Sequence, residues 1–236
     1  MTTTSPPLAS QTDFGAVAAI YDEVFPPHIR EHYLQRRTAY VLRNAPGATA
    51  LDVGAGTGLM AERLQELGIR VAALDPFPQM LDQLAARRPE ISTVVARGHN
   101  IPFADDTFDL TYSVAVMHHI ADRDLVRRTL SEMVRVTRRG GHIMIWDHNP
   151  LNPYWPILMR RVPQDSGAER LVPISELIKD LRDAGASIVR TDRLGLMPEF
   201  VPHRLLGIAA AIERAVEAAP VLRRFCAHNV VLAVKT

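Results

Sequence analysis

Two acids lie on either side of three closely spaced glycines in the first third of the chain. Asp52 comes two residues before Gly54, Gly56 and Gly58 follow at two-residue intervals, and Asp75 lies further along. Glycine lets a ligand lie against the main chain, because no Cβ stands in the way. A carboxylate beside such a loop favours a ligand with an ammonium group, and an acid at a strand tip can accept hydrogen bonds from ribose hydroxyls. These residues predict a site for a nucleoside with a cationic tail.

The residues around the glycines predict the elements that hold them. Residues 49–53 form a short apolar run of strand character. Residues 59–67 repeat apolar side chains at helical spacing up to Gly68, which suits a helix C-terminus. Residues 69–74 predict a second buried strand, ended by Asp75. Because a helix that begins at a glycine turn directs its free N–H groups at the ligand, the stretch is typical of a βαβ nucleotide-binding unit.

The glycine spacing separates this unit from other classes of enzyme. Dinucleotide enzymes use G-x-G-x-x-G, and Leu59 stands where their third glycine would be. No Gly-Lys-Ser/Thr follows, which excludes a phosphate-binding loop. No tyrosine has a lysine four residues later, and no Gly-x-Ser-x-Gly, His-Glu-x-x-His or Cys-x-x-Cys motif occurs. An ordinary tight turn between strand and helix is the plain alternative.

Several of these motifs resemble those of one enzyme family. The glycine loop, with Asp52 before it, is similar to motif I of the class I S-adenosylmethionine-dependent methyltransferases. Residues 101–109 resemble the "LPF…FD" signature of the type 11 family, which contains the ubiquinone and menaquinone C-methylases. Residues 135–141 resemble that family's lead into strand five, and the resemblance as a whole covers roughly residues 14–147. It implies that the cofactor is S-adenosyl-L-methionine and that the product is S-adenosyl-L-homocysteine.

The resemblance also implies which residues contact the cofactor. Tyr21 belongs to a segment similar to the family's N-terminal "YD" element, whose tyrosine often closes over the methionine end. The family's adenine-binding acid is replaced here by Arg97, His99 or Asn100, and the amide of Asn100 can still bond to adenine. The expected cofactor-binding residues are Tyr21, Asp52, Gly54, Ala55, Gly56, Asp75, Pro76, Met80, His99, Asn100, Ile101 and Ser113.

Histidines that follow two predicted strands are the candidates for catalysis on the acceptor side. His118 and His119 come directly after the predicted strand 110–116, and His148 follows the predicted strand 141–146. In open α/β sheets the ligand lies at the carboxyl ends of the strands, so these histidines are expected at the cleft. One of the adjacent pair is expected to pack away from it. Each is either a general base or a side chain that only shapes the pocket.

Helical periodicity predicts further elements near the cleft. Residues 14–24 and 29–43 are expected to be helices, and residues 122–139 a longer one that ends in basic residues and glycine. The periodicity of residues 202–225 predicts an amphipathic helix that packs on the core, in preference to membrane contact. A few polar residues either line a substrate mouth or belong to an ordinary polar helix surface: His28, His32, Tyr33 and Arg37.

These segments predict an α/β fold. The family resemblance implies a Rossmann-like, seven-stranded, mostly parallel sheet with helices on both faces and an antiparallel last strand. Residues 1–12 are expected to be disordered and residues 13–236 to form one domain. Within that domain, residues 13–44 are an expected N-terminal helical cap. Residues 150–173 and 198–225 are expected lid or substrate segments.

Bulk composition limits the partners. A formal net charge of +1 makes no electrostatic case for nucleic acid or for an anionic membrane. The single cysteine, Cys226, excludes an internal disulfide and fits a reducing cytoplasm. No apolar run reaches about 18 residues, so no membrane span is expected.

The function that these observations predict is methyl transfer from S-adenosylmethionine to an oxygen, nitrogen or carbon nucleophile of a small molecule, such as a natural product or a quinone-like acceptor. The sulfonium is already activated, so positioning of the nucleophile supplies much of the rate. No metal is expected, and the oligomeric state stays open. The alternative is a protein that binds S-adenosylmethionine without methylating, as a cyclase or a regulator would.

Overall fold

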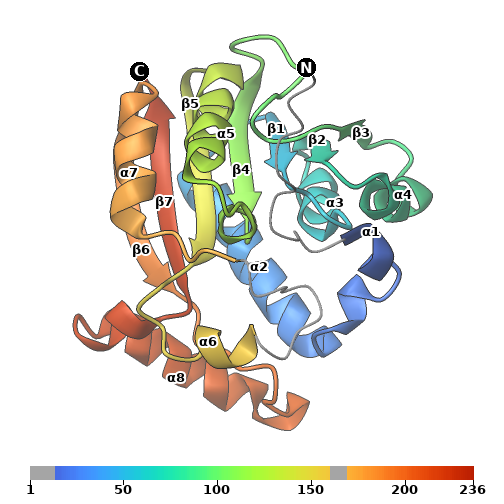
Figure 1. The fold of residues 1–236 in the computed structure, drawn as a ribbon. Helices are drawn as coiled ribbons and strands as arrows, with labels where there is room; N and C mark the ends of the chain where they lie inside the picture. The colour runs from blue at the N-terminus through green and yellow to red at the C-terminus, as the bar shows by residue number, and fades with distance from the viewer. Residues whose placement is uncertain (1–13, 160–168) are drawn as a thin grey trace, which may run out of the picture.

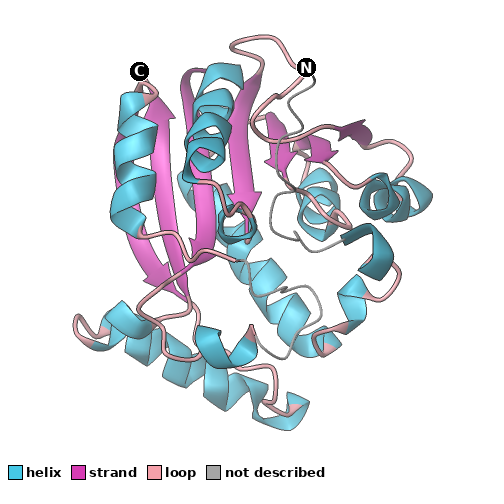
Figure 2. Ribbon diagram, viewed as in Figure 1, coloured by secondary structure: helices cyan, strands magenta, loops and turns pink. Residues whose placement is uncertain are grey.

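The molecule is built around a seven-stranded β-sheet. The computed structural model describes residues 14–159 and 169–236, so the predicted disorder of residues 1–12 lies outside the described residues, as do residues 160–168 of the expected lid. The strands lie in the order β3-β2-β1-β4-β5-β7-β6 (Figures 1 and 2). Their bounds are β1 Thr49–Val53, β2 Arg70–Asp75, β3 Ser92–Val95, β4 Phe108–Val114, β5 Thr137–His148, β6 Ala186–Leu194 and β7 His228–Lys235.

Strand pairing confirms the predicted sheet. The first five strands pair in parallel, and β7 lies antiparallel between β5 and β6. The strand order reverses at β1 and β4, because the chain runs outward from β1 to β2 and β3 and then returns to place β4 on the other side of β1. A ligand crevice forms outside the carboxyl ends of the strands at such a switch point. The fold therefore places the site beside the ends of β1 and β4.

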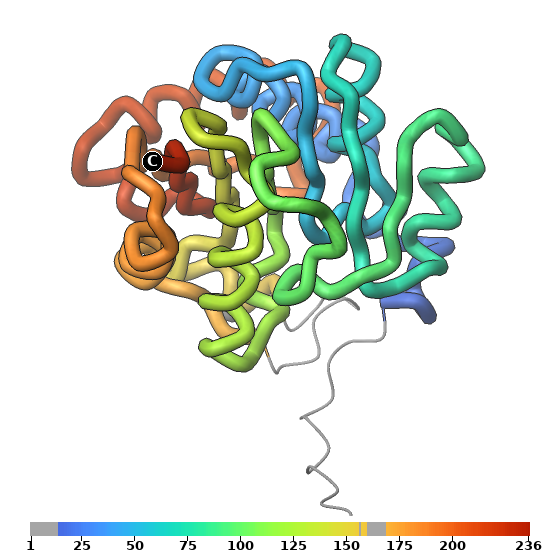
Figure 3. The backbone as a smooth tube through the Cα atoms, turned by 90° about the horizontal axis from the view of Figure 1, so that it is seen from above, coloured from blue at the N-terminus to red at the C-terminus, as the bar shows by residue number. Residues whose placement is uncertain are grey.

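Helices cover both faces of the sheet, as predicted. Side chains of α5 and α7 share one apolar core with the strands, and side chains of α2, α3 and α4 share a second core on the opposite face. Figure 3 looks down on these layers. The α-helices are α1 Phe14–Val17, α2 Pro27–Asn44, α3 Leu59–Glu66, α4 Pro78–Arg87, α5 Arg123–Val136, α6 Trp155–Leu158, α7 Ile174–Asp183 and α8 Leu206–Ala218.

The helix predicted over residues 122–139 ends earlier than expected. α5 stops at Val136, and Thr137 is the first residue of β5. The buried hydroxyl of Thr137 lies 2.8 Å from that of Thr111 on β4, and its backbone continues into strand pairing. The β-branched side chain of Thr137 fits this buried strand position. The chain therefore enters the sheet at Thr137, before the basic residues and glycine that were expected to end the helix.

The cap predicted as one helix over residues 14–24 is broken into two short pieces. α1 has four residues, and a 3₁₀ turn, η1 (Tyr21–Glu23), follows it. The hydroxyl of Thr57 in the glycine loop donates to the carboxylate of Asp22 at 2.7 Å. This contact ties the cap to the glycine loop.

The helix predicted over residues 202–225 is shorter than expected, and its apolar side faces solvent instead of the core. α8 is flanked by 3₁₀ turns, η3 (His203–Leu205) and η4 (Leu222–Phe225). Ile208 and Ile212 of α8 are 63% and 55% exposed, whereas Glu213 is fully buried. The prediction that this helix packs on the core through its apolar side is therefore wrong. Among the described residues, no helix is both long and apolar enough to cross a membrane.

Candidate functional site

The glycine loop between β1 and α3 requires glycine at positions 54 and 58, because a Cβ at each would clash with a different neighbouring side chain. Gly54 and Gly58 have φ angles of 79° and 78°, which side chains rarely adopt. A Cβ on Gly54 would lie 2.5 Å from the side chain of Val116, and one on Gly58 would lie 2.6 Å from that of Leu84. The N–H groups of Gly54 and Ala55 both donate to the carbonyl of Leu74, at 2.8 and 3.0 Å. The loop therefore folds tightly onto the end of β2.

Asp75 at the end of β2 fastens the loop from the other side. Its Oδ2 accepts the N–H of Gly56 at 2.8 Å, and its Oδ1 accepts the N–H of Phe77 at 2.9 Å. Burial raises the pKa of Asp75, and the two backbone N–H groups partly offset that rise. Each carboxylate oxygen has a second lone pair, so the side chain can still accept hydrogen bonds from two ribose hydroxyls.

Asp52 at the end of β1 is a buried acid without a cationic partner. Its carboxylate accepts the phenol O–H of Tyr112 at 2.9 Å, and no lysine or arginine within the described ranges pairs with it. Burial raises the pKa of Asp52 to about 7. The hydrogen bond from Tyr112 opposes this rise, and the nearby charge of Asp75 adds to it. A ligand ammonium would supply the missing positive charge. The side chain thus fits the amino-acid end of S-adenosylmethionine.

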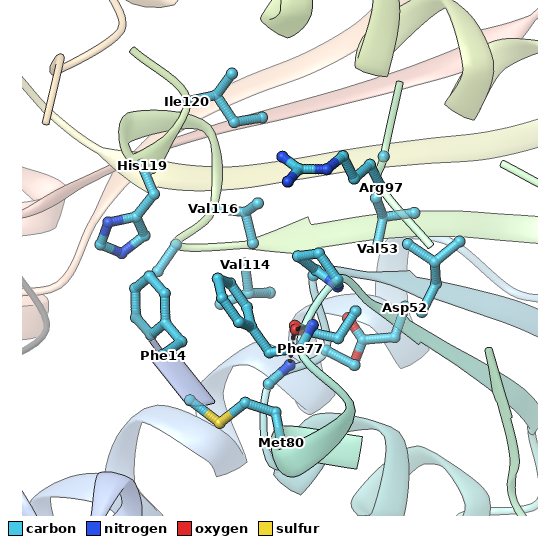
Figure 4. A pocket seen from close by; sticks show the side chains of 18 of the residues that line it. Phe14, Asp52, Val53, Phe77, Met80, Arg97, Val114, Val116, His119 and Ile120 are labelled. Atoms are coloured by element: carbon cyan, nitrogen blue, oxygen red, sulfur yellow. Dashed lines mark hydrogen bonds between the residues drawn. The ribbon is translucent and has the colours of Figure 1, made fainter. Parts of the chain in front are cut away.

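These groups line a first cavity of about 280 Å³. Figure 4 shows Phe77, Met80, Val114 and Val116 among the apolar residues that line it, together with the ring of Phe14. The rings of Phe14 and Phe77 lie 5.6 Å apart between their centroids. An apolar wall next to an acid at a strand tip suits a flat adenine with its ribose.

Nine of the twelve predicted cofactor residues line this first cavity: Tyr21, Asp52, Gly54, Ala55, Gly56, Asp75, Pro76, Met80 and His99. Three others do not line it. Asn100 is exposed to solvent, and Ile101, at 3% exposure, packs in the core beneath α5. Ser113 is buried within β4, and its neighbour Val114 lines the cavity instead, because successive strand residues face opposite sides of a sheet. Arg97 and Gly98 occupy the wall expected for Asn100.

A second cavity of about 300 Å³ lies next to the first. The two share lining residues at their junction, which are Tyr21, Asp22, Arg37, Leu59, Ala115 and His119. Most of the other walls are apolar or aromatic, and Phe25, Ile29, Trp155 and Leu158 are among them. Of the polar residues suggested for a substrate mouth, Tyr33 and Arg37 line this cavity. His28 instead bonds to the carbonyl of Val201, and His32 to Glu213.

His118 and Asp147 form a buried pair at the second cavity. His118 belongs to a 3₁₀ turn after β4, η2 (Met117–His119), and Asp147 lies at the end of β5. His118 Nδ1 lies 2.7 Å from Asp147 Oδ1, and both side chains are 1% exposed. The carboxylate also accepts the N–H groups of Met117 and His148, both at 2.6 Å. Burial would raise the pKa of Asp147, but the charge and hydrogen bond of His118 and the backbone bond outweigh it and lower that pKa.

Three further histidines around this pair stay neutral. Burial, with repulsion from His118, lowers the pKa of His119 to about 3. Burial, with repulsion from Arg37, lowers the pKa of His228 to about 3. Burial, with repulsion from His118, holds the pKa of His148 well below its ordinary value. The expectation that one of the adjacent histidines packs away from the cleft is wrong, because both line the second cavity.

His118, Asp147 and His148 also offer three ligand atoms within 4.8 Å of one another. A cation would lie in the plane of each imidazole ring, along the nitrogen lone pair. The rings of His118 and His148 are stacked, with centroids 3.8 Å apart and an angle of 25° between their planes. The two ring planes are therefore nearly parallel and offset from each other, so no cation close to both rings can lie in both planes, and the arrangement suits a hydrogen-bonded pair better than a metal ion.

Arg37 of α2 places a guanidinium between the two cavities. Its charge lies over the rings of Tyr33 and Trp146, at 5.4 and 5.9 Å from their centroids. Burial lowers its pKa, and Tyr33 and Tyr21 offset this in part. No acid in the described part of the chain forms an ion pair with it. An anionic group on a ligand would be its natural partner.

Sequence reasoning missed some of these residues. Asp147 is not among the predicted site residues, although an acid directly before His148, at the end of a predicted strand, is a usable signal. Asp22 is the acid of the "YD" element, but its bond to the glycine loop could not be predicted from that element. Thr57 and His228 carried no signal, because their positions depend on contacts between distant segments.

Comparison with known proteins agrees with this geometry. Residues 51–145 match the family model described as a methyltransferase domain. The demethylmenaquinone methyltransferase of Renibacterium salmoninarum is 33% identical over 162 residues, which cover 62% of this chain and 67% of the relative. A SAM-dependent methyltransferase from Archaeoglobus fulgidus has a TM-score of 0.68 at 18% identity, covering 92% of this chain and 99% of that one. The [4+2]-cyclase SpnF also has a TM-score of 0.68, at 16% identity and 97% coverage of both chains.

The residues of the first cavity fit the cofactor of this family. The glycines of the loop leave space that a Cβ would fill, and the Asp75 carboxylate has lone pairs that can accept from ribose hydroxyls. The buried Asp52 carboxylate has no cationic partner among the described residues. The cofactor is S-adenosyl-L-methionine. With the matching family model and the relative that is one-third identical, these findings show that the chain belongs to the type 11 family of class I S-adenosylmethionine-dependent methyltransferases.

Proposed function

We propose that this enzyme methylates a small aromatic acceptor with an acidic hydroxyl group, such as a hydroquinone. The observation that carries the proposal is the apolar and aromatic second cavity, which adjoins the cofactor cavity and is lined by His118, the partner of Asp147. The pair supplies a base, Arg37 supplies a positive charge, and the apolar walls exclude water. The relative named as a demethylmenaquinone methyltransferase supports a quinone-like acceptor.

His118 is the residue proposed to accept the proton of the hydroxyl group. Its Nδ1–H donates to Asp147, which leaves the Nε2 lone pair as the base and stabilises the imidazolium that forms. His119 and His148 were candidates for the same role, but a pKa of about 3 for His119 and a strongly lowered pKa for His148 make both too weak as bases near neutral pH. We therefore propose that His119 and His148 shape the pocket.

Arg37 is proposed to hold the oxygen that loses its proton. A guanidinium without an acid partner stabilises a phenolate at the junction of the two cavities. The bound cofactor supplies a methyl group that is already activated on sulfur. The negative charge of a phenolate is shared between its oxygen and its ring carbons, so the same residues serve O- and C-methylation. His118 would keep the hydroxyl proton in O-methylation. In C-methylation it would return that proton to the oxygen and take up the proton that the methylated ring carbon loses.

Two measurements test this proposal in sequence. Calorimetric titration with S-adenosylmethionine, S-adenosylhomocysteine and NADH should show binding of the two S-adenosyl ligands alone. Methyl transfer to a 1,4-naphthohydroquinone with a short prenyl chain is then followed by mass spectrometry. Cofactor that binds but is not consumed, across a panel of hydroquinones and phenols, would favour the non-methylating alternative.

Variants of the proposed base sharpen the second measurement. His118→Asn and Asp147→Asn should each lower kcat by roughly 10²–10⁴-fold and leave the affinity for S-adenosylhomocysteine unchanged. His142→Asn, on the same strand as Asp147 but away from both cavities, is the matched control and should keep full turnover. Full activity of His118→Asn would contradict the assignment of the base.

The cytoplasmic location expected from the single cysteine also stays a proposal.

A further inference from the structure

The apolar side of α8 faces solvent instead of the protein. Ile208 and Ile212, one helical turn apart, are 63% and 55% exposed. Glu213, the residue next to Ile212, is fully buried. An isolated domain gains stability by the opposite orientation, because buried carboxylates cost free energy and buried isoleucines supply it. The helix is therefore held in this orientation by specific contacts.

Those contacts are ionic bonds to α2. Glu213 pairs with Arg36 and with His32 Nε2, the latter at 2.6 Å, and accepts the N–H of Leu196 at 2.6 Å. Glu217 accepts two bonds from Arg36 at 2.7 Å. Burial raises the pKa of Glu213, but these partners outweigh it and keep that pKa below its ordinary value. Both acids of α8 thus point inward, and the isoleucines are left outside.

The segments at both ends of α8 extend the exposed apolar surface. Phe200 is 70% exposed, and Val221, Leu222 and Phe225 are between 49% and 65% exposed. The segment before α6 adjoins η4, because Asn152 donates its side-chain N–H to the carbonyl of Phe225 at 2.7 Å. Figure 1 shows α6 beside α8 at the same end of the molecule. We call this the α8 surface, made of Leu151, Ile157, Phe200, Leu205, Ile208, Ile212, Val221, Leu222 and Phe225.

The exposed charges of residues 200–225 have one sign. The exposed ionic side chains between residues 200 and 225 include Arg204, Arg214, Arg223 and Arg224. The only acids in that segment are Glu213 and Glu217, and both are engaged by Arg36. None of the four arginines pairs with an acid in the parts of the chain described. The formal net charge of +1 conceals this local excess of positive charge.

We propose that the α8 surface docks on an anionic lipid bilayer. An amphipathic helix with an exposed apolar side and flanking arginines binds the interface of such a membrane through buried apolar area and attraction to anionic headgroups. A second copy of this chain is a poorer occupant. In a two-fold contact the surface meets a copy of itself, and Glu213 and Glu217 of either copy are already paired with Arg36, so the four arginines would find no free acid on segment 200–225 of the other copy.

The position of the α8 surface connects it to the acceptor cavity. Leu158 lines the second cavity and follows Ile157, and Glu199 lines that cavity and precedes Phe200. An acceptor dissolved in the bilayer would therefore meet the second cavity at the docked surface. This part of the inference rests on the proposed function, because it takes the second cavity as the acceptor site.

Vesicle flotation tests the docking directly. The purified protein is mixed with vesicles of phosphatidylcholine alone or of phosphatidylcholine with phosphatidylglycerol. Two variants probe the surface: Ile208→Ser with Ile212→Ser, and Arg214→Glu with Arg223→Glu. The matched control is Val95→Ser with Val189→Ser, which removes two valines that are each 59% exposed on edge strands. The affinity for S-adenosylhomocysteine shows that each variant is folded.

The expected result is binding to the vesicles with phosphatidylglycerol, weakened by salt and by either surface variant by roughly tenfold or more, and unchanged in the control. No flotation, or flotation that neither surface variant weakens, overturns the proposal. If light scattering shows a dimer that the variant Ile208→Ser with Ile212→Ser dissociates, the α8 surface binds a second copy of this chain and the bilayer proposal is wrong. Methyl transfer to a water-soluble naphthohydroquinone without vesicles tests the proposed function separately, so failure of docking leaves that function standing.

Discussion

Replacing Asp52 by asparagine should make the cofactor-free protein less sensitive to rising pH. Burial raises the pKa of Asp52 from 3.8 to about 7, so folding favours the protonated acid. The stability contributed by the neutral form is complete below pH 3.8 and is lost as the pH rises through about 7. Each pH unit in this window is worth about 1.4 kcal/mol. Because Asp52 is already half ionised in the folded protein at pH 7, the unmodified protein should lose about 2 kcal/mol relative to Asp52→Asn between pH 5 and pH 7.

Urea denaturation at pH 5, 6, 7 and 8 measures this loss as the difference in the free energy of unfolding between the two proteins. The difference removes the contributions of the buried histidines, which both proteins share. Tyr112→Phe is an informative control, because loss of the phenol donor should move the pH window upward. A difference that changes by less than about 1 kcal/mol over this range would refute the reasoning.

Cofactor binding should depend on pH in the opposite sense. A ligand ammonium favours the ionised form of Asp52, so the affinity for S-adenosylhomocysteine should rise about tenfold per pH unit below pH 7 and level off above it. Calorimetry in buffers of different ionisation enthalpy should detect release of one proton. Asp52→Asn should bind weakly at every pH, without that proton release. A wild-type affinity that is flat from pH 5.5 to 7 would count against the ammonium contact.

Three further predictions concern the loop and its neighbours. Asp75→Ala should weaken S-adenosylhomocysteine binding by about 1–3 kcal/mol in a calorimetric titration, and unchanged affinity would discredit the ribose assignment. Gly54→Ala should destabilise the protein by about 2–4 kcal/mol in urea denaturation, because its Cβ would meet Val116, and Val116→Ala in the same chain should recover part of the loss. Ala115→Gly should raise stability by about 0.5–1 kcal/mol, since Ala115 has a φ of 56°; an unchanged or lower melting temperature would argue against strain there.

The sequence was sufficient for the sheet and for most of the cofactor cavity. The glycine loop and its flanking strands depend on local pattern, which a single sequence displays, whereas the antiparallel last strand was expected only from the family resemblance. Ser113 shows where such reasoning stops. A run of apolar residues indicates a buried strand but not which residue faces which side, and an error of one residue moves a side chain to the opposite face.

Long-range contacts account for the other differences. The pairing of His118 with Asp147 requires β4 and β5 to lie side by side, with Val114 opposite Trp146, and no local pattern specifies that register. The orientation of α8 is similar. Periodicity shows which side of the helix is apolar, but ion pairs from Glu213 to residues of α2 decide which side faces the protein.

The insertion of β7 between β5 and β6 has a consequence for the order in which the protein assembles during synthesis. β6 pairs with β7 and with no other strand of the sheet, yet α8 and its flanking turns are made between them. When β6 leaves the ribosome it has no strand to join and must wait until residues up to Lys235 emerge. The cofactor loop and β1 to β4 are complete well before that point. A nascent chain can therefore form its cofactor half early, while β6 and the edge of β5 are exposed to chaperones until β7 arrives.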